Sequence, residues 1–168
     1  QQHYQKCMVL AHHERMLEPD IFKSIVKNTP LVSIDLCLIH DRKILLGKRA
    51  NEPLKGKWFT PGGRILKNEP WQECMRRVAR SELGIEIDDL PSLILMGVWD
   101  HFYENSVMDE NISTHYLNLP HYCILEERPS LHIDQQHNDL KWFYLDEVAG
   151  KNNFHEYMQS YASWLIKV

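Results

Sequence analysis

The sequence lacks several features that define large classes of protein. Its 168 residues include four cysteines, which lie far apart and form no closely spaced pair of the zinc-binding kind. There is no apolar run long enough to cross a bilayer, no signal peptide pattern, no internal repeat and no low-complexity tract. A basic excess is also missing, because the formal net charge is −4, whereas a broad nucleic-acid surface requires a basic domain. These absences favour a cytoplasmic protein with reduced thiols, without a membrane or nucleic-acid partner, whose phosphate binding is confined to a local site.

The length suits a single domain, since domains commonly hold about 100 to 150 residues around one core. Residues 1–15 carry mixed charge without a clear periodicity. We therefore interpret residues 1–15 as a leader or N-terminal extension, with a genuine N-terminal arm as the alternative, and residues 16–168 as one domain.

The stretch 58–85, WFTPGGRILKNEPWQECMRRVARSELGI, combines a glycine turn with a helix. The turn, Pro61-Gly62-Gly63, gives the backbone freedom and allows close approach to a ligand. Asn68 fits an N-cap and Pro70 fits the first helical position, while Gly84 fits the stop. Apolar residues at steps of three and four predict a face that packs on a sheet: Trp71, Cys74, Met75, Val78, Ala79 and Leu83.

The segments on either side predict further helices and strands. Upstream, residues 20–28 predict an amphipathic helix capped by Asp20, and residues 31–40 and 43–49 predict a hairpin of buried strands. Downstream, the expected elements are antiparallel strands over 92–103 and 113–127 with a bulge or edge position at Pro120, a strand over 140–145, a helix from about Asp146 and a final helix over 153–167. This order indicates the α/β class, with a mixed sheet and helices on both faces.

The spacing within 58–85 resembles the Nudix box, the loop-helix-loop signature of hydrolases that act on nucleoside diphosphates linked to another group. The matching residues are Gly63, Glu69, Arg77, Glu82, Gly84 and Ile85. The family pattern has glutamates where this chain has Val78 and Ser81, so two of three clustered carboxylates are missing. These departures, and matches over most of residues 17–145, are most similar to the GDP-mannose mannosyl hydrolase branch, whose members usually start near Met16. The resemblance implies a Nudix α/β/α sandwich with a mixed β-sheet and a loop-helix-loop catalytic motif.

A divalent metal site is expected at the box. Magnesium favours oxygen ligands and bridges one or two carboxylates with substrate phosphates, so Glu82 and a carbonyl of the glycine turn suit it. The resemblance assigns that carbonyl to Gly62 and adds Gln136 as a ligand, with Mn²⁺ as a substitute for Mg²⁺. Without the box, Glu82 would be interpreted as an ordinary surface residue.

The depleted box cannot supply a general base, because Val78 cannot accept a proton and Ser81 carries no charge. Metal would then serve the leaving group rather than the nucleophile. His137 is a candidate base, since the unperturbed pKa of histidine, near 6.5, suits proton abstraction at neutral pH. From the residues alone, an exposed loop histidine is the competing interpretation. The resemblance gives the matching histidine the role of general base.

Three arginines are expected near the diphosphate, because the planar guanidinium suits phosphate oxygens. The resemblance places Arg49 and Arg64 there. Arg77 has a substrate role in the resembled enzymes, but helix geometry also permits an ion pair with Glu73, and the two interpretations remain open.

The resemblance assigns orienting roles to three further residues. Asp35 lies in the first strand, where it orients the substrate or faces solvent on an alternating strand. His101 and Tyr116 position the sugar and the leaving diphosphate, or occupy ordinary half-buried strand positions.

In the resembled family the N-terminal segment contacts the guanine, partly across a dimer interface. Here this would involve Leu17 and Phe22 in a homodimer, and an aromatic ring stacked on a base is physically sensible. The alternative for Phe22 is a core position in the first helix.

Together these features predict hydrolysis of GDP-mannose, and of GDP-glucose as a further substrate, to GDP and the free sugar. Water would attack the anomeric carbon with inversion, as in inverting glycosidases. One alternative is a Nudix pyrophosphatase that releases a nucleoside monophosphate and a sugar 1-phosphate. The other is a binding module that keeps a nucleotide-sugar pocket without turnover.

Overall fold

A computed structural model describes residues 17–132 and 139–168 of the chain. The helices are α2 (Pro19–Asn28), α3 (Trp71–Val78), the π-helical turn η1 (Ala79–Leu83), the 3₁₀ turn η2 (Ile87–Asp89), α4 (Leu145–Gly150) and α5 (Glu156–Leu165). The strands are β1 (Leu31–His40), β2 (Lys43–Lys48), β3 (Trp58–Phe59), β4 (Gly62–Arg64), β5 (Ile94–Leu95), β6 (Trp99–Tyr103), β7 (Thr114–Ile124) and β8 (Leu140–Tyr144). The leader expected over residues 1–15 lies outside the described residues.

The predicted hairpin forms from β1 and β2, which pair antiparallel around a two-residue turn. Both turn residues, Asp41 and Arg42, have positive φ angles of 46° and 59°. Two consecutive left-handed residues are typical of the type I′ turn, whose twist matches that of the flanking strands. The predicted hairpin is therefore confirmed, with its turn at Asp41 and Arg42.

The strands of the described residues form one mixed sheet in the order β3-β2-β1-β7-β5, to which β4, β6 and β8 add at β1, β7 and β2. The central pair, β1 and β7, is parallel over nine residues, and the other pairs are antiparallel. A long parallel pair at the centre makes β1 buried on both faces, so its sequence is a nearly continuous apolar run.

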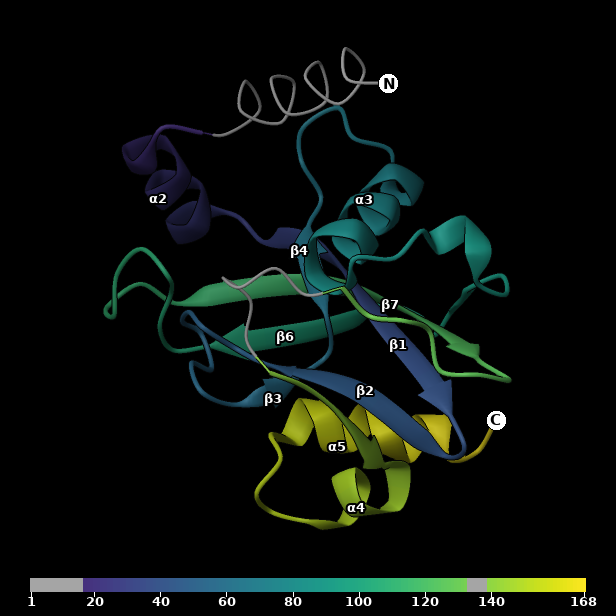
Figure 1. The fold of residues 1–168 in the computed structure, drawn as a ribbon. Coiled ribbons are helices and arrows are strands. Elements are labelled where there is room, and N and C mark those ends of the chain that lie inside the picture. The colour runs from purple at the N-terminus through teal and green to yellow at the C-terminus, as the bar shows by residue number, and fades with distance from the viewer. Residues whose placement is uncertain (1–16, 133–138) are drawn as a thin grey trace.

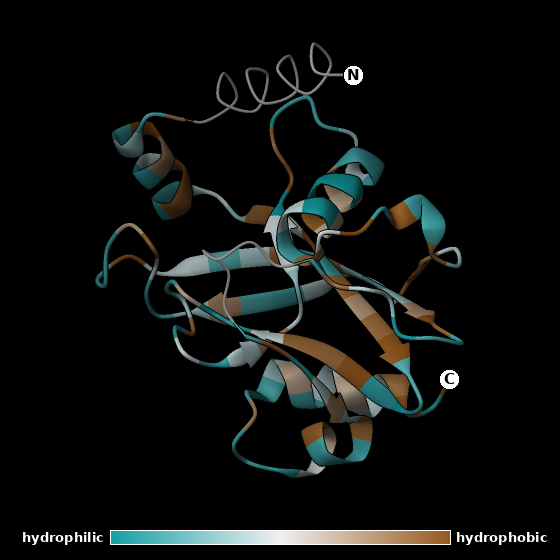
Figure 2. Cartoon of the chain, viewed as in Figure 1, coloured by the Kyte–Doolittle hydropathy of each residue, from teal (hydrophilic) through white to brown (hydrophobic). Residues whose placement is uncertain are grey.

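Helices cover both faces of this sheet, which confirms the predicted α/β/α architecture. Figure 1 shows α3 on one side and α4 with α5 on the other. One apolar core packs α5 against the sheet, and the apolar residues at helical spacing in and just before this helix are all buried: Phe154, Met158, Tyr161, Ala162 and Leu165. The second core packs α3 and η1 against the sheet. The hydrophobic residues of β1 and β2 run between the two layers (Figure 2).

Pro120 lies inside β7, in the centre of the sheet rather than at an edge. The carbonyl oxygen of Pro120 accepts a hydrogen bond from the backbone N–H of Met96. In a strand the N–H and C=O of one residue point to the same side, so the nitrogen of Pro120, which has no hydrogen, also faces the segment between β5 and β6. Leu95 pairs with His121 and Trp99 with Asn118, which leaves one extra residue on the β5–β6 side. The expected bulge is present, but it lies in the neighbouring segment between β5 and β6. At the bulge the regular pairing is interrupted, so no hydrogen bond from the nitrogen of Pro120 is required.

Two predictions for α2 need correction. The residue before the helix is Glu18, and Asp20 lies in the first turn without a capping hydrogen bond. Of the apolar stripe, only Val26 is buried, and Ile21 is exposed. α2 is therefore held by few core contacts.

None of the helices in the described part of the chain has the length and hydrophobicity needed to cross a bilayer. Cys37, Cys74 and Cys123 are buried and unpaired, as expected for structural thiols. Cys7 lies outside the described residues.

Candidate active site

The glycine turn lies directly against the central strand. β4 pairs with β1 so that Gly62 is opposite Asp35. A Cβ at position 62 would meet Asp35 Oδ1 and lie 2.7 Å from the carbonyl oxygen of Ile34. Glycine at 62 is therefore required by close approach to β1, and that approach places its backbone at the cavities described below.

The start of α3 differs from the prediction. Pro70 is the residue before the helix, Trp71 is its first residue, and no side chain caps it. Asn68 instead has a φ of 62°, a conformation that asparagine tolerates better than most residues. The turn is closed by Glu69, whose carboxylate accepts from the Leu66 backbone at 2.9 Å. Asn68 therefore does mark a change in backbone conformation before α3, but it adopts a left-handed conformation and does not cap the helix.

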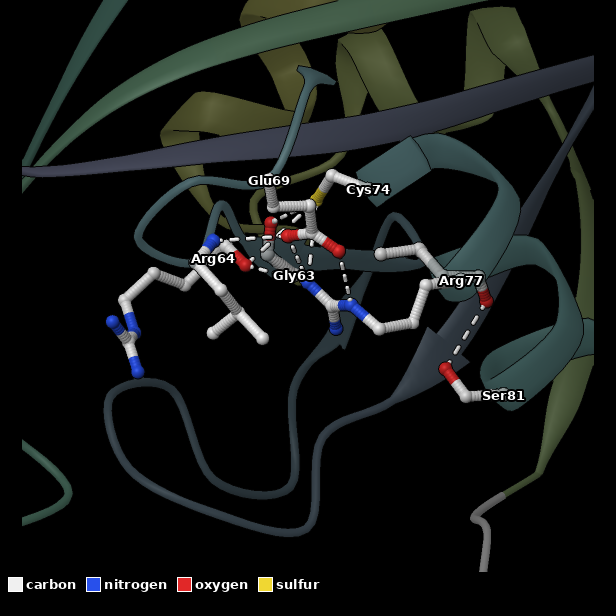
Figure 3. A network of polar contacts seen from close by, with 8 residues as sticks. Gly63, Arg64, Glu69, Cys74, Arg77 and Ser81 are labelled. Carbon is white, nitrogen blue, oxygen red and sulfur yellow. Dashed lines mark hydrogen bonds and ion pairs between the residues drawn. The ribbon is translucent and has the colours of Figure 1, made fainter. Parts of the chain in front are cut away.

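A polar network joins α3 to the glycine turn, and we call it the box network: Gly63, Arg64, Leu66, Glu69, Cys74 and Arg77 (Figure 3). Arg77 donates to both carboxylate oxygens of Glu69, at 2.7 and 2.9 Å, and to the backbone oxygen of Arg64 at 2.8 Å. The Glu69 side chain is 4% exposed. Hydrogen bonding to Glu69 raises the pKa of Arg77. Of the two interpretations left open for Arg77, the ion pair with Glu73 is wrong, because Glu73 pairs with Arg76 at 2.7 Å and Arg77 pairs with Glu69.

The buried face of α3 follows the predicted spacing, with one exception: Trp71 is exposed and stacks on His121. Val78 is in the core, so the position that carries a glutamate in the family pattern faces away from solvent. The Ser81 hydroxyl donates back to the Val78 carbonyl at 3.4 Å. The helix continues as the π turn η1 and ends at Gly84, with a φ of 64°, which confirms the predicted stop.

The π turn affects the direction of Glu82. Four residues after the buried Val78, a regular α-helix would return to the core face, whereas a π turn is wider and changes that register. Leu83 takes the core position and Glu82 lines a cavity.

Cavity 1, of about 310 Å³, lies between the end of β2, the glycine turn and η1. Its wall includes Arg49, Thr60, Gly62, Glu82 and Leu140. Glu82 is the one carboxylate among the described residues that line it. The two described metal ligands of the prediction, Gly62 and Glu82, are therefore at the same cavity. The part of the chain that the structure describes holds no cluster of three or more His, Cys, Asp or Glu side chains with metal-binding geometry.

Cavity 2, of about 130 Å³, adjoins cavity 1 and shares four wall residues with it: Arg49, Phe59, Thr60 and Gly62. Its other walls include Asp35, Arg64 and Tyr116, and the unpredicted Tyr103 and Asn118. Five of the predicted site residues line this one space: Asp35, Arg49, Gly62, Arg64 and Tyr116. Arg77 lines neither cavity.

Asp35 is a buried carboxyl, so the solvent-facing interpretation is wrong. The Tyr161 hydroxyl donates to its Oδ2 at 2.8 Å. Burial raises its pKa to about 6, while the hydrogen bond from Tyr161 and the charge of Arg49 act in the opposite direction. Tyr161 comes from α5, so the C-terminal helix contacts a side chain that lines cavity 2.

His101 is fully buried and lines neither cavity. Its Nδ1 contacts the amide of Asn118, whose Oδ1 accepts from Ser33, and its ring stacks on Tyr157 with centroids 3.9 Å apart. Burial lowers the pKa of His101 to about 4, so the ring is neutral. Because Asn118 lines cavity 2, His101 stands behind the wall of the site.

α2 reaches the site through one contact. The guanidinium of Arg64 lies 4.7 Å above the ring of Phe22, a cation–π geometry. Phe22 is half-buried and belongs to neither apolar core, so the core interpretation is wrong. Leu17 is exposed.

Gln136 and His137 lie outside the described residues. The residues on either side of this gap are bonded to elements that border cavity 1: the backbone N–H of His132 donates to the Leu83 carbonyl in η1, and the Asp139 carbonyl accepts from the backbone N–H of Lys48 in β2. Leu140 lines the cavity itself.

Thr60, Tyr103, Asn118 and Tyr161 were missed as site residues. Thr60 directly precedes the glycine turn, so its position in the sequence was a usable signal. Tyr103 follows His101 by two residues and therefore shares its strand face. Asn118 and Tyr161 carried no local signal, because only the sheet register and the docking of α5 bring them to the site.

The sequence and the fold were compared with known proteins. Residues 29–165 match the family model described as the NUDIX domain. The chain is 38% identical over 146 residues to the low-salt glycan biosynthesis protein Agl8 of Haloferax volcanii, which covers 87% of this chain and 88% of that protein. A shorter match, 39% identity over 56 residues and one third of each protein, is to ADP-ribose pyrophosphatase of Methanocaldococcus jannaschii.

Among solved structures, the MutT NUDIX hydrolase from Burkholderia pseudomallei superimposes with a TM-score of 0.66. It is 24% identical and covers 82% of this chain and 99% of its own. At this identity the likeness concerns the fold.

Proposed function

Because the chain belongs to the Nudix family, we propose that it hydrolyses GDP-mannose, and GDP-glucose as a further substrate, to GDP and the free sugar. The observation that carries this proposal is the depleted box: Val78 is in the core and Glu82 alone among the described residues presents a carboxylate to cavity 1. A site with so few carboxylates is poorly equipped to generate a metal-bound nucleophile at phosphorus. Attack at the sugar carbon requires only a base and a stabilised leaving group.

In this reaction His137 takes the proton of a water whose oxygen bonds to the anomeric carbon. The bond between that carbon and the diphosphate oxygen breaks, and GDP leaves with the electron pair. Arg49, shared by both cavities, and Arg64 in cavity 2 stabilise the charge on the leaving diphosphate. Displacement in one step inverts the configuration of the anomeric carbon.

The residues at cavity 1 fit one magnesium ion. Gly62 offers a backbone carbonyl and Glu82 a carboxylate, and both line the same space, while Gln136 is the third ligand in the proposal. A small number of protein ligands is sufficient for Mg²⁺, because this ion keeps several of its waters and also binds substrate phosphates. When bound, Mg²⁺ or Mn²⁺ supplies positive charge to the diphosphate.

Asp35, His101 and Tyr116 have positioning roles in the proposal. Asp35 and Tyr116 line cavity 2, and the hydroxyl of Tyr161 fixes the Asp35 carboxylate. His101 acts through Asn118, which it contacts from behind the cavity wall. Arg77 acts through the box network, which fixes the glycine turn.

The setting of the reaction is also a proposal. Agl8 is a glycan biosynthesis protein by its name, and glycan assembly uses activated sugars, which supports a nucleotide sugar as substrate. Buried, unpaired thiols suit the reducing cytoplasm. We place Leu17 and Phe22 at the guanine in a homodimer, supported by the contact that brings Phe22 to Arg64 at cavity 2.

The decisive test is hydrolysis of a panel of nucleotide sugars with magnesium in ¹⁸O-labelled water. The proposal expects GDP and a labelled free sugar, with the anomer of inverted configuration seen first by NMR. Label in phosphate would contradict attack at carbon. Tight binding of GDP-mannose without product over hours would indicate a binding module instead.

The base is tested by His137→Gln, which should lower kcat by a factor of about 100 or more, as typical for loss of a general base. His132→Gln is the matched control, because it removes a histidine from the same segment without removing the proposed base. Nearly full turnover in His137→Gln would contradict the assignment.

A pyrophosphatase that releases GMP and mannose 1-phosphate is the second candidate. The local match to an ADP-ribose pyrophosphatase favours it. In the panel experiment this enzyme would place the label in a monophosphate and release no free sugar.

A further inference from the structure

The two cavities meet at a residue to which no role has been given. Thr60 lines both of them, with Arg49, Phe59 and Gly62. It follows β3 and directly precedes the glycine turn. Any ligand that extends from one cavity into the other must pass this residue.

The Thr60 side chain is buried, at 5% exposure, and its hydroxyl has no hydrogen-bond partner among the described residues. A buried hydroxyl without a partner is costly, and most such groups in native proteins are paired. Valine has the same shape and would avoid this cost, so stability of the ligand-free fold does not explain threonine here.

Three polar groups near Thr60 have partners of their own. Arg49 Nε donates to the Pro53 carbonyl, and Asp35 Oδ2 accepts from Tyr161. The Pro61 carbonyl accepts from the Leu36 backbone. A partner for Thr60 is therefore best supplied by a molecule in the cavities.

The hydroxyl oxygen has less than 1 Å² of accessible surface, so it is turned into the wall. Rotation about χ1 from one staggered rotamer to the next moves the hydroxyl into the position held by the methyl group or by the hydrogen on Cβ. Such a rotation needs no movement of the backbone. It costs little for this side chain, because the hydroxyl gives up no described hydrogen bond.

We propose that Thr60 is a substrate contact, and that its hydroxyl donates a hydrogen bond to a diphosphate oxygen where the ligand passes from cavity 1 to cavity 2. Arg49 is at the same junction, so phosphate there meets a charged donor and a neutral one together. The inference rests on the proposed function, because it takes a nucleoside diphosphate sugar as the ligand.

The test compares two isosteric substitutions, Thr60→Val and Thr114→Val. Thr114 is equally buried, but its hydroxyl donates to the Asn105 carbonyl at 2.8 Å, so it is the satisfied counterpart. Thermal unfolding is measured without ligand, and the Kd of GDP is measured by calorimetry with magnesium. GDP serves as the probe because it contains the diphosphate and is not consumed.

Thr60→Val should raise the unfolding midpoint by about 2 to 4 °C and weaken GDP binding about tenfold. Thr114→Val should lower the midpoint and leave the Kd of GDP unchanged. Thr60→Ser, which keeps the hydroxyl, should retain GDP affinity within about twofold of the wild type. A gain in stability with a loss of affinity separates a ligand contact from a structural hydroxyl.

Unchanged GDP affinity in Thr60→Val overturns the inference, whatever its stability. A lower midpoint also overturns it, since the hydroxyl would then have a partner within the protein. Wild-type protein that binds GDP but leaves GDP-mannose intact contradicts the proposed function alone. Wild-type protein that does not bind GDP removes both.

Discussion

The box network and the wall of the two cavities use arginine in opposite ways. Arg77 meets Glu69 with two hydrogen bonds and holds the backbone of the glycine turn, so its charge is neutralised within the protein. The Arg49 side chain makes one described hydrogen bond, to the Pro53 carbonyl, and lines both cavities. The first arginine builds the site and the second is available to a ligand. Membership in a sequence motif therefore does not distinguish a structural charge from a functional one.

The comparison is tested most strongly by Arg49→Gln. Loss of a charged donor at a leaving diphosphate should lower kcat/KM by a factor of about 100 to 1,000. The unfolding midpoint should stay near that of the wild type, because Arg49 forms no ion pair in the described residues. Steady-state kinetics on GDP-mannose measure the first effect and calorimetry the second. The control is Arg42→Gln, which removes an exposed arginine paired with Asp146. If a fall in stability explains the loss of activity, Arg49 has a structural role like that of Arg77.

Arg77→Gln should give the reverse pattern. It leaves the buried Glu69 carboxylate without its bidentate partner, which should cost about 3 kcal/mol of unfolding free energy. The double variant Glu69→Gln/Arg77→Gln removes both charges and should recover part of the loss. Urea denaturation of the three proteins gives the coupling. If Arg77→Gln lowers activity while stability is unchanged, Arg77 contacts substrate.

Gly62→Ala tests whether the two regions meet at the glycine turn. The added methyl group would meet Asp35 Oδ1 and the Ile34 carbonyl, so the turn or β1 must move, at a cost of about 1 to 3 kcal/mol. The activity should fall by more than the loss of folded protein explains, since Gly62 lines both cavities. Gly150→Ala is the control, because nothing lies within 4 Å of a Cβ there. Equal behaviour of the two variants would show that the close approach is unimportant.

The smallest effect is expected from pH and concerns stability. His101 has a pKa of about 4 in the folded protein, lowered by burial and by the neighbouring His155, with Asp100 acting in the opposite direction. In the unfolded chain its pKa is near 6.5. Its contribution is complete above pH 6.5 and is lost as pH falls toward 4, because the unfolded state takes up the proton first.

Between pH 6.5 and 5 this loss amounts to about 1.5 kcal/mol. His101→Asn should therefore have a flatter stability curve than the wild type, measured by urea denaturation at several pH values. The raised pKa of Asp35 has the opposite effect, since it lowers stability as pH rises. Asp35 is present in both proteins, so its effect cancels from the difference between the two curves. Parallel curves would contradict a buried neutral ring.

The sequence predicted the fold well because its signals are local. The apolar β1 and β2, the stop at Gly84 and the inner face of α5 each follow from spacing within one element. The site was predicted in part, since Gly62, Glu82, Arg49, Asp35, Arg64 and Tyr116 line the two cavities.

The failures have a common physical cause, which is competition between partners that are distant in sequence. Arg77 could reach Glu73 along the helix, but Glu69 is buried and needs the charge more. Tyr161 is predicted as an apolar core residue, yet its hydroxyl reaches Asp35, 126 residues away. Asn68 was read as a cap because capping and left-handed turns favour the same residue.

The contact between Phe22 and Arg64 has a consequence for the N-terminal helix. Arg64 lines cavity 2, and its guanidinium also holds α2, which has little other burial. A ligand that draws Arg64 away from Phe22 weakens the docking of α2, whereas a ligand that leaves the pair intact does not change this contact. By thermodynamic reciprocity, detaching α2 alters the affinity for that ligand by the same factor. The rate of proteolysis near residue 18, just before α2, should therefore report whether a ligand occupies cavity 2 and displaces Arg64.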